Sequence, residues 1–196
     1  MAVRVMLVSP AMNAALREAR FAGDAPLDDS GLRRARAAAG TLPAADRTVH
    51  GPSRRCTRTA DALGVRSVVE PATHDWELGR WSGARLDEVS ASEPEDVAAW
   101  LADPAAAPHG GESLLDLCAR VGAWLDSLDL DGDSPRRVLA VVEPAVVRAA
   151  VVRALELPPQ AFWRIDVAPL ALTDLSGRAG RWNLRCGRPL APGPGR

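Results

Sequence analysis

The sequence contains no lysine and no tyrosine, so all of its 24 basic residues are arginines. An arginine-only basic set, together with many alanines and 16 prolines, is typical of a GC-rich genome. The abundance of arginine therefore does not by itself indicate an anionic ligand. The 25 acidic residues give a formal net charge of -1, so no overall field attracts nucleic acid or a membrane surface.

Cysteine is also scarce, and long hydrophobic runs are missing. The three cysteines, Cys56, Cys118 and Cys186, are far apart and show neither a CxxC motif nor a metal-ligand spacing. Such a set is typical of reduced thiols in the cytoplasm. The N-terminus lacks the pattern of a signal peptide, and no apolar run approaches the roughly 20 residues that span a bilayer. We expect a soluble cytoplasmic protein.

Short apolar runs alternate along the chain with longer amphipathic segments. The runs predict strands over residues 3–8, 47–50, 66–70 and 138–142, the last of them central in a sheet. The segments between them predict helices over residues 31–42, 51–63, 112–128 and 144–155. Residues 162–167, 171–175 and 182–185 are predicted to form edge strands.

This alternation predicts an α/β fold, a three-layer α/β/α sandwich with a mostly parallel central sheet. We expect a single domain over residues 1–186 and a flexible Pro/Gly-rich tail over 187–196. Ligands in such folds bind beyond the carboxyl ends of the strands. The residues predicted there are Ser9-Pro10, the segment from His50 to Arg55, the segment from His74 to Glu77, and Glu143-Pro144.

Five segments resemble one family pattern, in the same order. Arg20-Phe21 with Asp24, Pro26, Leu27 and Gly31 resembles "RF…D-x-P-L-T-x-x-G", and Pro52, Arg55, Thr59 and Ala60 resemble "S-P-L-x-R-A-x-Q-T-A". Asp75, Gly79, Trp81 and Gly83 resemble "E-x-x-x-G-x-W-x-G", Gly110 to Ser113 resemble "G-G-E-S", and Val146 to Ala149 resemble "V-I-R-A". The chain thus resembles the histidine phosphatase superfamily, the phosphoglycerate-mutase-like proteins, over about residues 3–185.

The catalytic positions depart from that family. The resemblance implies a first strand ending in Arg-His-Gly, with a histidine that becomes phosphorylated, but the chain has Ser9, Pro10 and Ala11 there. The second histidine of the family falls on Glu143, and its acidic proton donor falls on Asp75. Of the four residues that hold phosphate in the family, only Arg55 remains. A proline cannot act as a nucleophile, and a carboxylate repels phosphate, so we expect a degenerate member without ordinary phosphatase or mutase activity.

Two interpretations of these substitutions remain open. Ser9-Pro10 and Glu143-Pro144 both fit the N-cap and first position of a helix, which would mean that the cleft changed only toward stability. Alternatively the cleft was rebuilt, with a bidentate Arg55–Glu143 pair closing the phosphate site or with Asp75 and Glu143 acting as acid and base.

The leading hypothesis is a pseudoenzyme that binds a small ligand or a protein partner in the former phosphate cleft. The candidate ligand-binding residues are Ser9, Arg20, His50, Arg55, His74 and Arg148. A second hypothesis is a lyase, isomerase or cyclase that uses Asp75 and Glu143, and a third is a residual phosphomonoesterase. Whether the chain is an enzyme therefore stays open. We predict no cofactor, no nucleic-acid or membrane partner, and leave a homodimer open.

Other residues have simpler interpretations. His50, His74, Asp75 and Glu143 have no recognised ligand spacing, so we predict no metal site. Cys56 is expected to be a buried structural thiol, and His109 a solvated turn residue. Trp76 and Trp81 are expected in the core or in the wall of an apolar cavity, whereas Arg20 and Arg148 orient a ligand carboxylate or pair with acids such as Glu112.

Overall fold

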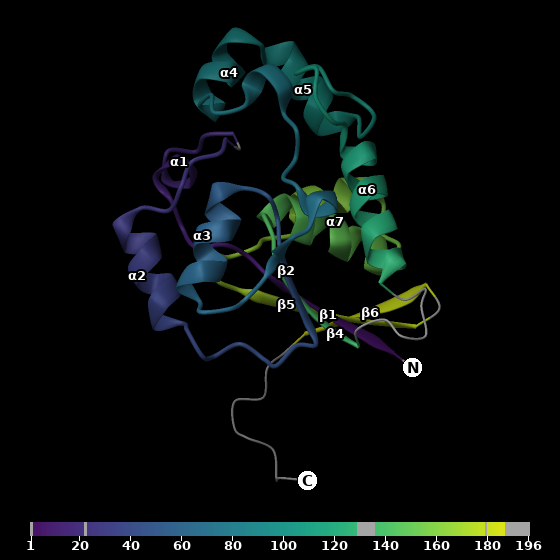
Figure 1. Cartoon of the computed structure of the whole chain (residues 1–196). Helices are drawn as coiled ribbons and strands as arrows, with labels where there is room; N and C mark the ends of the chain where they lie inside the picture. The colour runs from purple at the N-terminus through teal and green to yellow at the C-terminus, as the bar shows by residue number, and fades with distance from the viewer. Residues whose placement is uncertain (1, 22, 129–135, 179, 187–196) are drawn as a thin grey trace.

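A mixed β-sheet forms the centre of the molecule (Figure 1). The computed structural model describes residues 2–21, 23–128, 136–178 and 180–186. Within these ranges the sheet has six strands in the order β3-β2-β4-β1-β5-β6. They are β1 (Val3–Val8), β2 (Arg47–His50), β3 (Val68–Val69), β4 (Arg137–Val141), β5 (Leu172–Arg178) and β6 (Arg181–Arg185). Strands β1 to β4 pair in parallel, and β5 and β6 join them in antiparallel fashion.

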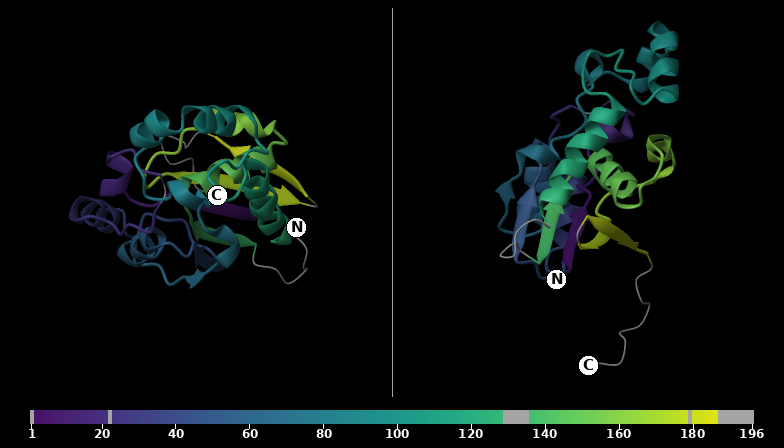
Figure 2. Two further views of the ribbon diagram at one scale, coloured as in Figure 1. Left: turned by 90° about the horizontal axis from the view of Figure 1, so that it is seen from above. Right: turned by 90° about the vertical axis from the view of Figure 1, so that its right-hand side faces the viewer.

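The helices lie on both faces of this sheet and beyond one of its ends. They are α1 (Ala14–Arg17), α2 (Asp29–Ala37), α3 (Arg54–Ala62), α4 (Leu86–Ser92), α5 (Pro94–Ala102), α6 (Leu114–Ser127) and α7 (Pro144–Ala154). Short 3-10 helices span Pro71–Thr73, Gly79–Trp81 and Pro159–Arg164. In Figure 2, α2 and α3 lie on one side of the sheet and α6 and α7 on the other, while α4 and α5 lie beyond the end of the sheet.

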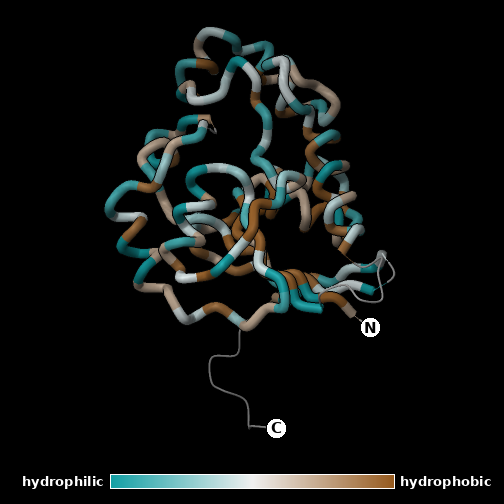
Figure 3. Tube along the Cα trace, viewed as in Figure 1, coloured by the Kyte–Doolittle hydropathy of each residue, from teal (hydrophilic) through white to brown (hydrophobic). Residues whose placement is uncertain are grey.

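The side-chain alternation of β1 explains this layering. Val3, Val5 and Leu7 pack with α6 and α7, whereas Met6 and Val8 pack with α3. Because successive side chains of a strand point to opposite faces, a strand with apolar side chains on both faces needs a helical layer on each side. The apolar segments accordingly gather around the sheet in Figure 3. The predicted three-layer α/β/α sandwich with a mostly parallel sheet is confirmed.

Several local predictions are wrong. The segment 162–167 is not a strand: a 3-10 helix with a proline at its start covers Pro159–Arg164 and buries Phe162 in the core. Strand β5 lies between β1 and β6 and is therefore not an edge. Helix α4 was not predicted, because the irregular segment before α5 has no clear periodicity.

The domain limits and the C-terminal tail are two further expectations from the sequence. The predicted domain limits stay a prediction, and the tail over residues 187–196 lies outside the described residues. In the described ranges, no helix is both long enough and apolar enough to cross a membrane.

Candidate functional site

The candidate site lies where three parallel strands end. Strands β2, β4 and β1 are neighbours in the sheet, so their carboxyl ends meet at one edge. Ser9 and Pro10 follow β1, Ser53 follows β2, and Glu143 follows β4. The side chain of Ser53 caps α3 by accepting a hydrogen bond from the Cys56 backbone N–H, which fixes the first turn of α3 at this edge. Arg55 lies in that turn.

A buried ion pair between Arg55 and Glu143 occupies the centre of the site. Nη1 of Arg55 lies 2.7 Å from Oε2 of Glu143, and the side chains are only 10% and 5% exposed. The other carboxylate oxygen, Oε1, accepts a hydrogen bond of 2.8 Å from Oγ of Ser53. Both oxygens of Glu143 therefore have a partner, one from Arg55 in α3 and one from Ser53, the N-cap residue of α3.

The pair differs in detail from the predicted bidentate one. Only one nitrogen of Arg55 bonds Glu143, because Nε donates to the carbonyl oxygen of Ala11 at 2.9 Å and Nη2 to that of Pro10 at 3.4 Å. Arg55 thus ties the segment after β1 to the segment after β4. Glu143 is the N-cap residue of α7, with Pro144 at the first position as predicted, but its side chain makes no cap hydrogen bond.

Ser9 and Pro10 do not begin a helix, so that prediction is wrong. Oγ of Ser9 donates to the carbonyl oxygen of Ala168 and accepts from the N–H of Ala171 at 3.0 Å. Ser9 is fully buried and points to the segment before β5. The first helix starts only at Ala14, where the Asn13 side chain accepts from the Leu16 N–H.

Asp75 is a buried carboxyl of the site whose pKa is shifted. Burial, followed by the charge of Glu143, raises the pKa of Asp75 to about 7. A hydrogen bond from the Trp76 N–H to Oδ1 of Asp75, at 2.8 Å, and the charges of Arg55 and Arg120 act in the opposite direction. A carboxyl with a pKa near neutrality can exchange a proton at physiological pH.

Two cavities lie at this site, and Asp75 and Glu143 line both of them. The larger, of about 490 Å³, has Trp76, Leu78 and Pro52 as apolar wall residues. Among the described residues, four carboxylates line it, those of Asp24, Asp75, Glu77 and Glu143, and no arginine does. The smaller, of about 150 Å³, is lined in addition by Arg20 and Arg55. The larger cavity is thus an acidic one with an aromatic wall.

The remaining predicted residues divide into two groups. His74 lines the larger cavity, with Nδ1 2.8 Å from its neighbour's carbonyl oxygen, and Arg20 lines the smaller one while pairing with Glu18. Ser9, His50 and Arg148 line neither cavity, and each contacts a main-chain carbonyl oxygen. Nδ1 of His50 lies 2.9 Å from the carbonyl oxygen of Gly51, and Arg148 donates to the carbonyl oxygen of Ile165 at 2.7 Å. The structure therefore brings together Arg55, Asp75 and Glu143.

Arg120 in α6 is a residue that the sequence did not indicate. Its guanidinium pairs with Glu112 at 2.8 Å and donates to the carbonyl oxygens of Ala72 and His74, at 2.8 and 3.0 Å. It thereby holds the segment that carries Asp75. The amphipathic pattern of α6 could have shown that Arg120 lies on its partly buried face, but not which carbonyls it meets.

Buried groups around the site correct one expectation and confirm another. His109 is not solvated: it is only 1% exposed, and its ring packs against Trp81. Cys56 is buried as expected, and burial together with Glu143 raises the pKa of its thiol well above the usual value, so it is no nucleophile at neutral pH. Trp81 lies in the core. In the part of the chain that the structure describes, no group of three or more His, Cys, Asp or Glu residues is arranged to hold a metal ion.

Comparisons with known proteins agree on one family. The sequence model of the histidine phosphatase superfamily (branch 1) matches residues 11–187. The chain is 31% identical over 189 residues to the glucosyl-3-phosphoglycerate phosphatase of Mycolicibacterium vanbaalenii, a match that covers 82% of this chain and 84% of the relative.

Solved structures give the same result for the fold. A mycobacterial glucosyl-3-phosphoglycerate phosphatase in complex with VO3 superposes with a TM-score of 0.81 at 27% identity, covering 93% of this chain and 97% of that one. The alpha-ribazole phosphatase of Shigella flexneri gives a TM-score of 0.82 at 19% identity, over 99% and 100% of the two chains. The second likeness concerns the fold alone.

Proposed function

The chain belongs to the histidine phosphatase superfamily, branch 1, and on that premise we propose that it is a member without phosphatase or mutase activity. In this proposal the cleft at the strand ends binds a small ligand, or a side chain of a protein partner, without phosphoryl transfer. The observation that carries the proposal is the Arg55–Glu143 pair, which places a carboxylate on the cation that would otherwise meet phosphate.

The position of the nucleophile supports the proposal. In the pattern that the chain resembles, a histidine follows the arginine at the end of the first strand, and Pro10 stands there in this chain. Phosphoryl transfer through histidine requires a ring nitrogen with a free lone pair, which a proline within the chain lacks. The match to the family model starts at Ala11 and so includes neither Ser9 nor Pro10.

The electrostatics of the cleft support it as well. A phosphate oxygen about 4 Å from the Glu143 carboxylate would be repelled by about 4 kcal/mol per unit charge at an effective dielectric constant near 20. That energy corresponds to roughly a thousand-fold loss of affinity. Arg55 offers little compensation, since its Nη1 already donates to Glu143 and its other nitrogens donate to main-chain carbonyls.

The relatives define the decisive test. Their name makes glucosyl-3-phosphoglycerate the first substrate to assay, together with p-nitrophenyl phosphate as a general phosphomonoester. We expect no release of phosphate above the rate in buffer, with the Mycolicibacterium vanbaalenii phosphatase as the active control. We also expect no binding of vanadate in calorimetry. Turnover that disappears in the Arg55→Ala variant would show a residual phosphomonoesterase and would overturn the proposal.

One observation favours a second candidate, an enzyme of altered acid–base chemistry. Glu143 lies close enough to Asp75 to help raise the pKa of Asp75 to about 7, and both residues line a cavity with an apolar wall. Such a pair can donate and accept protons on an uncharged or cationic substrate, as a lyase, isomerase or cyclase requires. Asp75→Asn separates the candidates: an enzyme loses its turnover in a folded protein, whereas a non-catalytic ligand-binding protein shows no turnover of any metabolite to lose.

A further inference from the structure

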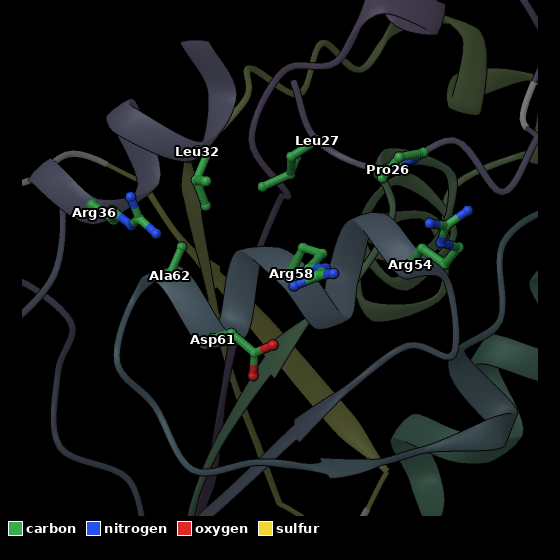
Figure 4. A pocket seen from close by; sticks show the side chains of 8 residues that line it. All are labelled: Pro26, Leu27, Leu32, Arg36, Arg54, Arg58, Asp61 and Ala62. Atoms are coloured by element: carbon green, nitrogen blue, oxygen red, sulfur yellow. The ribbon is translucent and has the colours of Figure 1, made fainter. Parts of the chain in front are cut away.

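A second concave surface lies between α2 and α3, outside the cleft. We call it the arginine trough; Figure 4 shows its lining side chains. Leu27 and Leu32 form one wall, and Arg54, Arg58 and Asp61 of α3, with Arg36 of α2, surround the rest of its volume of about 470 Å³. It shares no lining residue with either cavity of the candidate site. From its charge and shape we propose that the trough binds an acidic peptide segment of a partner protein.

The arginines of the trough form no ion pair within the described ranges, although one carboxylate, that of Asp61, also lines the trough. Arg36, Arg54 and Arg58 are all exposed, and none forms an ion pair with a described residue. Some exposed arginines elsewhere do form such pairs, for example Arg47 with Glu70 and Arg137 with Asp46, whereas others, such as Arg33 and Arg34, do not. The positive charge of the trough is thus left for another molecule.

The placement of these charges on α3 is unfavourable in the isolated chain. Arg54 and Arg58 are four residues apart on one helix, where like charges repel each other. Arg54 also lies in the first turn of α3, close to the positive end of the helix dipole. An anionic partner in the trough would relieve both repulsions. The backbone N–H of Arg54 donates to the carboxylate of Asp24, which lines the larger cavity of the candidate site. The side chain of Arg54 lines the trough.

The dimensions of the trough fit a short extended peptide. The stretch of α3 from Arg54 to Ala62 rises by about 12 Å at roughly 1.5 Å per residue. An extended chain covers that length with about four residues at roughly 3.4 Å each. Such a segment can place two carboxylates on the arginines and one apolar side chain against Leu27 and Leu32, which are half-buried and line the trough.

Other anions fit less well. The arginines are spread along the trough, and Asp61 stands beside Arg58, which opposes the concentrated charge of a phosphate group. A long polyanion such as RNA gains from a broad positive field, but the chain as a whole has a net charge of -1. An acidic peptide meets spaced positive charges and an apolar wall, and is the partner that the trough fits best.

The proposal is tested with a fluorescein-labelled peptide of sequence EELEEL and fluorescence anisotropy. We expect saturable binding that falls as NaCl rises to about 0.3 M, because exposed ion pairs are screened. Arg36→Glu with Arg58→Glu should weaken it by about tenfold or more. The matched control is Arg33→Glu with Arg34→Glu, the same change of charge on exposed positions of α2 outside the trough, which should weaken it by less than about threefold. The peptides QQLQQL and EEAEEA should bind less well than EELEEL.

The opposite results would refute it. Equal weakening by the two double variants would mean attraction by net charge alone, and no binding of EELEEL would leave no acidic-peptide site. Displacement of EELEEL by millimolar inorganic phosphate, or by single-stranded RNA at a lower concentration than the peptide, would assign the trough to another anion. Far-UV circular dichroism shows whether the variants are folded, and Arg36→Gln with Arg58→Gln replaces the charge reversal if it is not. These positions lie outside the cleft, so the result is independent of the phosphatase assays.

Discussion

Removing one member of the Arg55–Glu143 pair should destabilise the fold markedly. In Glu143→Ala, Arg55 keeps its bonds to the carbonyls of Ala11 and Pro10 but loses its buried counter-charge. Breaking a buried pair costs about 3 to 5 kcal/mol. We expect the lower end, about 3 kcal/mol, because Asp75 ionises more readily once Glu143 is gone and partly replaces it. For a chain of this length that lowers the Tm by roughly 6 to 12 °C.

The assay is a double-mutant cycle in urea at neutral pH. Arg55→Ala, Glu143→Ala and the double variant should show a coupling energy of about 2 kcal/mol, since the second substitution removes a charge that is already unpaired. Glu77→Ala is the control: Glu77 lines the same cavity, but its side chain is 69% exposed, so we expect a change below about 0.5 kcal/mol. Additive effects of the two alanine substitutions would refute the view that the pair acts as one buried unit.

Three other substitutions test the surroundings of the site. The pKa of Asp75 is raised to about 7, so its ionisation lowers the free energy of unfolding as the pH rises from about 4 to about 7. Asp75→Asn removes this loss and should be more stable than the wild type by up to about 4 kcal/mol near pH 8, but by almost nothing near pH 4. Urea unfolding at both pH values measures the difference. A gain that is equal at the two pH values would contradict this sign. Arg120→Ala should lower the free energy of unfolding in urea by about 3 kcal/mol, and Arg120→Lys by less, because the Arg120 side chain is only 18% exposed. Equal losses in the two variants would contradict a role of the guanidinium in holding the segment that carries Asp75. Gly79→Ala should lower the Tm far more than Gly40→Ala. Both glycines have positive φ, but only at Gly79 would an added Cβ lie 2.1 Å from a carbonyl oxygen, that of His109. Similar thermal melts of the two variants would speak against that close approach.

The sequence predicts those features that depend on local periodicity and on strand order. Nearly continuous apolar runs over residues 3–8 and 138–142 indicated buried strands, and the corresponding strands β1 and β4 are both central in the sheet. Since the carboxyl ends of parallel strands meet at one edge, Arg55 and Glu143 could be expected to converge from positions 88 residues apart. Topology thus predicted that the two residues meet, but not which nitrogen of Arg55 bonds Glu143.

Other features depend on partners that no local pattern shows. Ser9 followed by proline looks like a helix start, but the carbonyl of Ala168, 159 residues further along, takes its hydroxyl instead. His109 looks like a polar turn residue, yet Trp81 and Trp100 enclose it. In both cases a long-range contact outweighs a local preference, which is why turn and cap signals near a binding cleft are weak guides.

The two interpretations of the altered cleft make different demands on Asp75. If the cleft had changed only toward stability, each acid in it would have its charge neutralised, as Glu143 does through Arg55 and Ser53. Asp75 does not fit that condition, because burial and Glu143 keep its pKa near 7, so that its ionised form makes the folded state less stable at neutral pH. A destabilising carboxyl that lines two cavities is more typical of a binding site than of a filled one. We therefore propose that the Arg55–Glu143 pair closes one part of the cleft, and that Asp75, which lines the cavity with the apolar wall, is the residue that meets a ligand.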